Sequence, residues 1–136
     1  MPGETHLPHL LATMQPVLNP GQYVYCTAPA AVSIPADMIL GSFREAEGLT
    51  LIMPREAADA HGLAYEYVAA WLTLKVHSSL AAVGLTAAVA AALTQENISC
   101  NVVAAYYHDH VFVAQADAER ALATLQALSA QAGRLS

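Results

Sequence analysis

Charged side chains are scarce in this chain of 136 residues: they make up 12% of the sequence, and only five are lysine or arginine. The formal net charge is −6 at pH 7. Proteins that bind nucleic acids neutralise phosphates with clusters of basic side chains. The shortage of positive charge therefore argues against a nucleic-acid partner.

Long apolar runs are also missing, although 56% of the residues are hydrophobic, many of them alanine. The best candidate for a membrane span, residues 80–93, is shorter than the about 20 residues that a bilayer requires. It is also interrupted by Gly84 and Thr86. The first residues lack the basic leader and apolar core of a secretory signal. We therefore expect no membrane segment and a cytoplasmic location.

Cysteine occurs twice, as Cys26 and Cys100, without the spacing of a redox or zinc motif. Each lies in an apolar, strand-like run, so we expect free buried thiols in preference to a disulfide. Phosphate-binding and dinucleotide-binding motifs are absent, and no carboxylate pair stands out as a general acid and base. The sequence thus predicts no catalytic residues, no resident metal and no cofactor.

The second half of the chain has the pattern of a β-α-β-β-α unit. Its predicted elements are an extended segment 64–76, a helix with apolar residues from Leu85 to Leu93, a hairpin formed by 100–106 and 111–114, and a last helix after Asp117. This is a ferredoxin-like unit without its final strand.

The first half is a similar unit that lacks its first strand. Strands are predicted over 22–27, 38–44 and 49–53, and a short helix over 54–61. Two incomplete units in one chain must share strands or borrow them from a partner chain. We therefore predict an α+β fold with an N-terminal half-domain over 1–70 and a C-terminal domain over 71–136. Few charges and much apolar surface also predict a homodimer.

The loop from Ser78 to Thr86 is the candidate ligand site. Gly84 opens the following helix, where a glycine permits close approach and free N–H groups attract an anion. We expect Cys100 and Asn101, at the start of the next strand, to lie at the same edge, and an asparagine side chain can both donate and accept. On local chemistry alone, a turn that merely packs the helix on the sheet is the commoner alternative.

Gly84 at the helix start and the step Asn97-Ile98-Ser99-Cys100-Asn101-Val102 resemble the ACT domain. Asn97 stands where the family usually has glycine, and asparagine tolerates the left-handed conformation. The segment 43–71 more loosely resembles the first of two tandem ACT units, as in the regulatory region of aspartate kinases.

The resemblance implies two interlocked or strand-sharing βαββαβ units in a non-enzymatic regulatory or sensor protein that binds a small molecule, an amino acid. The resemblance also implies where this ligand binds, because the ligand loop of the family and the strand facing it correspond to segments of this chain. The expected ligand contacts are Ser78, Ser79, Val83, Gly84, Leu85, Thr86, Cys100 and Asn101.

Two alternatives stay open. One is a structural or protein-binding module without a ligand. The other is a metal-dependent enzyme that uses His108, Asp109 and His110 across a dimer interface. Within one chain, His77 is the tempting third ligand. We expect the first and third strands of the unit to run parallel, which separates His77 from the hairpin by roughly 15–20 Å. We therefore predict that Asp109 forms a turn and that the two histidines have structural or interface roles.

Overall fold

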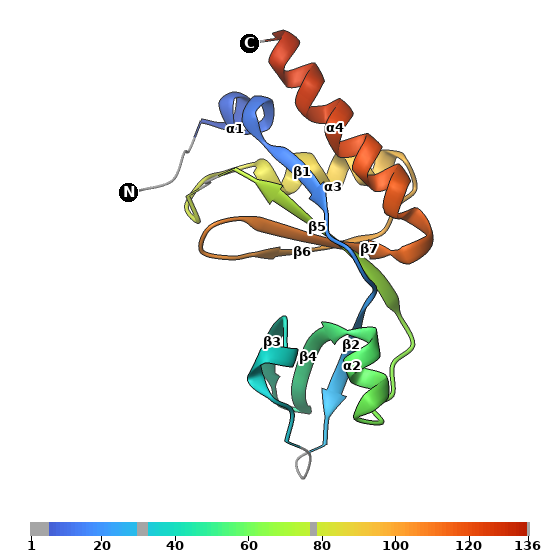
Figure 1. The fold of residues 1–136 in the computed structure, drawn as a ribbon. Coiled ribbons are helices and arrows are strands. Elements are labelled where there is room, and N and C mark those ends of the chain that lie inside the picture. Colours follow the sequence, from blue (N-terminus) through green and yellow to red (C-terminus); the bar gives the residue numbers. More distant parts are fainter. Residues whose placement is uncertain (1–5, 30–32, 77–78, 136) are drawn as a thin grey trace. The chain divides into compact units, whose positions relative to one another are not determined.

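The computed structural model describes residues 6–29, 33–76 and 79–135. They form two compact units (Figure 1), which we call the large and the small unit. The small unit comprises residues 20–70, and the large unit comprises the described residues up to 19 and from 71 on. The division into 1–70 and 71–136 remains a prediction from the sequence, and in the structure the contacts group the described residues up to 19 with those from 71 on.

The sheet of the large unit explains this grouping. Its strands are β1 (Gln15–Leu18), β5 (Val68–Lys75), β7 (Asp109–Ala114) and β6 (Cys100–Ala104), in this spatial order. β1 pairs with β5 in antiparallel fashion, with Gln15 opposite Lys75 and Leu18 opposite Leu72. β1 is therefore the final strand that the β-α-β-β-α pattern lacked. The predicted ferredoxin-like fold is confirmed, and the missing strand comes from the N-terminal end of the same chain.

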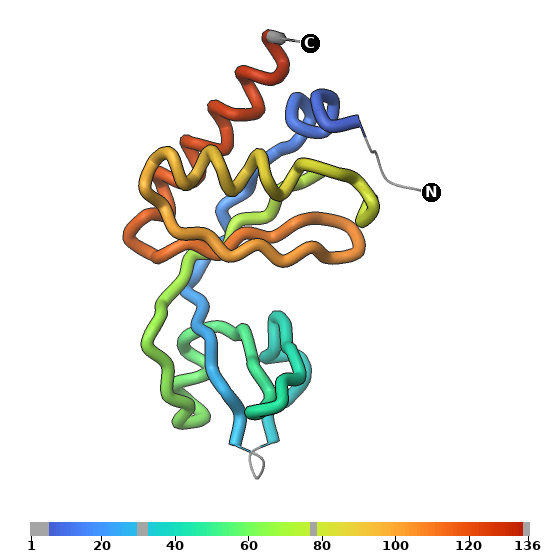
Figure 2. Tube along the Cα trace, turned by 180° about the vertical axis from the view of Figure 1, so that it is seen from behind, coloured from blue at the N-terminus to red at the C-terminus, as the bar shows by residue number. Residues whose placement is uncertain are grey.

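Three helices lie on one side of this sheet (Figures 1 and 2): α1 (Leu7–Thr13), α3 (Leu85–Gln95) and α4 (Ala118–Leu135). In α3, Leu85, Val89 and Leu93 are buried, four residues apart, as the apolar stripe predicted. The helix ends at Gln95 with Glu96 as its C-cap, and Asn97 has φ +59, the left-handed conformation expected of it. None of the described helices is long and apolar enough to cross a membrane.

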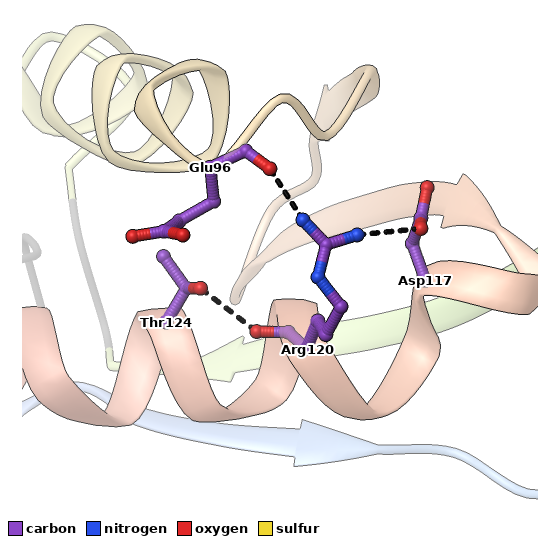
Figure 3. Close-up of polar contacts among 4 residues, drawn as sticks. All are labelled: Glu96, Asp117, Arg120 and Thr124. Atoms are coloured by element: carbon purple, nitrogen blue, oxygen red, sulfur yellow. Dashed lines mark hydrogen bonds and ion pairs between the residues drawn. The ribbon is translucent and has the colours of Figure 1, made fainter.

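Arg120 ties the end of α3 to the beginning of α4 (Figure 3). Its Nη2 donates a hydrogen bond to the carbonyl oxygen of Glu96 just past α3. Its Nη1 donates to Asp117 Oδ1 over 2.9 Å, and its own carbonyl accepts a hydrogen bond of 2.8 Å from Thr124 Oγ1. A cation that bonds a carbonyl at a helix C-terminus also complements the helix dipole. This contact helps to hold α3, and with it the helix start at the other end, in place.

The small unit repeats the same strand order. Its strands are β3 (Gly41–Glu45), β4 (Gly48–Pro54) and β2 (Tyr23–Ala28), followed by the first residues of β5, where Val68 lies opposite Val24. One helix, α2 (Arg55–Ala60), follows β4, and the described residues between β2 and β3 contain only the short 3₁₀ helix η1 (Ala36–Met38). The core comprises Val24, Cys26, Leu51, Met53, Ala58 and Leu63. β5 thus closes this sheet and, from Trp71 on, begins the sheet of the large unit, so the predicted strand sharing is confirmed.

β5 and β7 run in opposite directions, and here the sequence analysis was wrong. The ring of Trp71 stacks on that of Phe112, with centroids 6.5 Å apart, while the carbonyl oxygen of Val76 lies 3.4 Å from His108 Nδ1. In a βαββαβ unit the first two strands are parallel, and the third lies between them with opposite direction. The hairpin before β7 therefore lies beside the end of β5. His77 itself lies outside the described residues.

Both cysteines are free, as expected: Cys26 is buried in the core of the small unit, and Cys100 is half-buried at the start of β6. Burial raises the pKa of both thiols. They therefore behave as packing side chains more than as nucleophiles.

Candidate functional site

A cavity of about 120 Å³ lies in the large unit at the start of α3. Its lining residues are Ser79, Leu80, Ala82, Gly84, Leu85, Thr86, Ala104 and Asp109. They come from four segments: the loop after β5, the start of α3, the end of β6 and the start of β7. Because β5 and β6 are parallel, their C-terminal ends meet at one edge of the sheet, and β7 begins at that edge.

Gly84 precedes α3 with φ +104, in the left-handed region that favours glycine. A Cβ atom at this position would lie 2.9 Å from Leu7 Cδ2 of α1, so the residue is needed for packing as well as for conformation. The N-cap residue of α3 is Gly84, which has no side chain that could cap the helix. The backbone N–H groups of the first turn, including those of Leu85 and Thr86, have no intrahelical acceptor and carry the positive end of the helix dipole.

Asp109 lines this cavity from the start of β7. The residue is only 8% exposed, and it pairs with Ala104 as the first residue of β7. Burial raises the pKa of the Asp109 carboxyl, while the neighbouring His110 and His108 lower it to a smaller extent. Burial disfavours the charged form of a carboxylate, so a cationic group beside Asp109 in the cavity would be favoured there.

The structure brings together some of the residues that the sequence singled out, and separates others. Ser79, Gly84, Leu85 and Thr86 line the cavity, whereas the side chain of Val83 is 83% exposed and does not. Ser78 lies outside the described residues.

Cys100 and Asn101 begin β6, while the cavity adjoins Ala104 at the end of that strand. The sequence analysis placed these two residues beside the loop because it assumed that the start of the second strand lies there. In the structure, the end of that strand lies beside the loop. Asp109 was assigned to a turn, yet it is the buried carboxylate of the site. One signal in the sequence could have placed Asp109 at the site: it comes directly after the hairpin turn that follows the second strand. Because the first two strands are parallel, this turn lies at the same edge of the sheet as the loop.

The two histidines make structural contacts. His110 Nδ1 accepts a hydrogen bond of 3.0 Å from Trp71 Nε1 and lies 3.1 Å from Thr73 Oγ1. An accepting Nδ1 means that the neutral ring carries its proton on Nε2. Burial, and then His108, lower the pKa of His110, in keeping with a neutral ring. Within residues 6–29, 33–76 and 79–135, no group of three His, Cys, Asp or Glu side chains could hold a metal ion.

Comparison with known families identifies the class of protein. One ACT domain model matches residues 2–70, and a second ACT domain model matches residues 66–127. The chain belongs to the ACT domain family and carries two such domains in tandem. The two matches overlap at residues 66–70. In the structure, β1 belongs to the large unit, although the first match includes its residues.

Similar solved structures include a Vibrio cholerae protein of unknown function described as a possible transport protein, with 44% identity and a TM-score of 0.80 over 90% of this chain and 95% of that one. An Agrobacterium tumefaciens protein is 20% identical, with a TM-score of 0.63 over 85% of this chain and 89% of that one. The ligand-free regulatory subunit of aspartate kinase from Thermus thermophilus is 11% identical, with a TM-score of 0.57 over 87% and 98%. None of the curated proteins compared with the sequence matches it.

These findings confirm the resemblance to tandem ACT proteins. ACT domains are ligand-binding regulatory modules, and the chain falls in that general class. The distant aspartate kinase structures share its fold.

Proposed function

We propose that this protein binds a free amino acid in the cavity at the start of α3 and acts as a regulatory or sensor module without catalytic activity. The observation that carries the proposal is that the buried residue Asp109 and the glycine-led start of α3 line the same small cavity. An amino acid presents an ammonium group and a carboxylate on adjacent positions. The two walls match these charges in sign.

The ammonium group of the ligand pairs with Asp109, and its carboxylate accepts hydrogen bonds from the first-turn N–H groups at Leu85 and Thr86. Ser79 contributes a hydroxyl group at the rim, and Gly84 leaves the approach to the helix start open. A cavity of about 120 Å³ holds a group of a few non-hydrogen atoms. We therefore expect a small amino acid, or a larger one whose side chain extends into solvent.

Regulation follows from association of two chains. Leu80 lines the cavity and is 67% exposed, and the adjoining Val83 is 83% exposed. Large apolar side chains in such positions, on a chain with few charges, suit a surface that a second copy covers. A ligand held beside this surface stabilises one arrangement of the homodimer, and it shifts the population toward that arrangement by its difference in affinity.

A panel of the twenty amino acids tests the proposal by thermal shift, followed by isothermal titration calorimetry of those that raise the melting temperature. We expect Asp109→Asn to weaken binding at least tenfold, because it removes the charge that pairs with the ammonium group. The matched control is Asp37→Asn, at an exposed aspartate of η1 in the small unit, which should bind within twofold of the wild type. The Asp109→Asn variant should not melt at a lower temperature than the wild type, since this substitution removes a buried charge.

Three results would contradict the proposal. The first is a panel in which no amino acid shifts the melting temperature, which would favour a structural module. The second is an Asp109→Asn variant with unchanged affinity. The third is purified protein that carries stoichiometric zinc and loses it when His108 and His110 are replaced by glutamine, which would favour the metal-dependent alternative.

A further inference from the structure

The small unit contains a second and larger cavity, of about 420 Å³. It lies between the segment that leads into β2 and the beginning of α2, and all its lining residues fall within 20–70: Pro20, Gly21, Gln22, Tyr23, Pro54, Arg55, Glu56 and Asp59. Its volume is in the range of small-molecule sites, roughly 300–1,000 Å³. The sequence patterns did not single out any of these residues as functional.

Arg55 is the central cation of this cavity, and it is held in one orientation. Its Nε donates to the hydroxyl of Tyr65 over 2.8 Å, and its Nη1 donates to Gln22 Oε1 over 2.9 Å. The guanidinium carbon also lies 5.6 Å from the centroid of the Tyr65 ring. Tyr65 is fixed in turn, because its hydroxyl donates to Asp59 Oδ1 over 2.7 Å.

A guanidinium group has five N–H donors, and these contacts engage two of them. Among the described residues, none accepts a hydrogen bond from the remaining Nη1 and Nη2 protons. A cation fixed in this way loses little side-chain entropy when it binds a carboxylate. The exposed arginine is therefore prepared for an anionic group.

The charges around Arg55 restrict what that anion belongs to. Glu56 and Asp59 line the same cavity, so its three charged side chains carry one positive and two negative charges. A phosphate or other multiply charged anion would be repelled by the two carboxylates. A zwitterion satisfies both signs, because its carboxylate pairs with Arg55 while its ammonium group faces Glu56 and Asp59.

We propose that this cavity is a second binding site, for a zwitterion of the size of an amino acid or a dipeptide, with Arg55 as the carboxylate ligand and Glu56 as an ammonium ligand. The site lies wholly within the small unit and does not depend on the cavity at α3. The competing explanation is that Arg55, Tyr65, Asp59 and Gln22 form a clamp that serves the fold alone.

The test uses the full chain with Asp109→Asn, so that binding at α3 is weakened and contributes less to the signal. The twenty amino acids and the dipeptide Ala-Ala are titrated into ¹⁵N-labelled protein while the Arg55 Nε–H and the Gln22 side-chain amide resonances are followed. We expect at least one zwitterion to shift both resonances in a saturable way. Arg55→Gln should weaken this binding at least tenfold, as measured by calorimetry. Arg44→Gln, at an exposed arginine of β3 in the same unit, should bind within twofold of its parent.

Glu56→Gln separates binding from the clamp, because the hydrogen bonds of Arg55 to Tyr65 and Gln22 remain. We expect it to weaken zwitterion binding at least threefold with an unchanged melting temperature, and it decides the matter if Arg55→Gln does not fold. Three results would each overturn the proposal. The first is that no probe shifts the resonances, and the second is that Arg55→Gln or Glu56→Gln binds as tightly as its parent. The third is that inorganic phosphate binds as tightly as the zwitterions.

Discussion

Replacing Gly84 with alanine tests how the start of α3 is positioned. The substitution places a Cβ atom in a backbone with φ +104, and that atom would lie 2.9 Å from Leu7 Cδ2. Real Cβ contacts essentially never approach this closely, so either Leu7 or the loop must move. We therefore expect two separate penalties, one from the backbone and one from packing.

The backbone penalty for a residue other than glycine in left-handed conformation is roughly 1–2 kcal/mol. Displacement of a packed leucine side chain from its rotamer adds on the order of 0.5–1.5 kcal/mol. The free energy of unfolding should therefore fall by about 2–3 kcal/mol. Gly62→Ala is the matched control, since Gly62 has φ +67 and nothing lies within 4 Å of the position of its Cβ. It should lose about 1 kcal/mol, from the backbone alone.

Urea denaturation measures both variants, and Leu7→Ala provides a double-mutant cycle. If the packing contact is real, Gly84→Ala should cost less in the Leu7→Ala background, with a coupling energy of about 0.5–1.5 kcal/mol. The backbone penalty should persist there. Equal losses for Gly84→Ala and Gly62→Ala, together with no coupling to Leu7, would refute the reasoning.

Two further predictions concern pH and assembly. Because burial holds the pKa of His110 below its ordinary 6.5, its contribution to stability should be complete above pH 6.5 and decline as the pH falls toward that lower pKa. His110→Asn keeps an acceptor for Trp71 Nε1 and should show a smaller loss of unfolding free energy between pH 7.5 and 5.5; an equal loss in both proteins would contradict this role. The chain should be a homodimer by light scattering at micromolar concentration. Val83→Ser should weaken the dimer, while the control Ala116→Ser, at an exposed residue outside the cavity, should not. A monomeric wild type would disprove the assembly.

The elements themselves could be predicted because their signals are local. Helix α3 follows from the four-residue spacing of Leu85, Val89 and Leu93, and α2 follows from Pro54 before it and Gly62 after it. The order of the elements in the second half was sufficient to indicate a ferredoxin-like unit. It also indicated that one strand was missing.

The origin of the missing strand depended on pairing between distant segments. β1 has four residues, Gln15–Leu18, and one of them is Pro16, which cannot donate to a ladder. So short a segment carries no reliable strand signal of its own. It becomes a strand because it lies opposite 72–75 of β5, more than fifty residues along the chain.

The sequence by itself therefore determined the ACT family, the two units and the loop at Gly84, because periodicity, turn residues and motif order are local properties. The tertiary structure alone decided what faces that loop. An aspartate after a hairpin has the same local pattern whether it is exposed or buried, and the burial of Asp109 depends on the antiparallel placement of β7 between β5 and β6. The charge that we propose to bind an amino acid is thus set by strand direction, and local sequence patterns do not encode it.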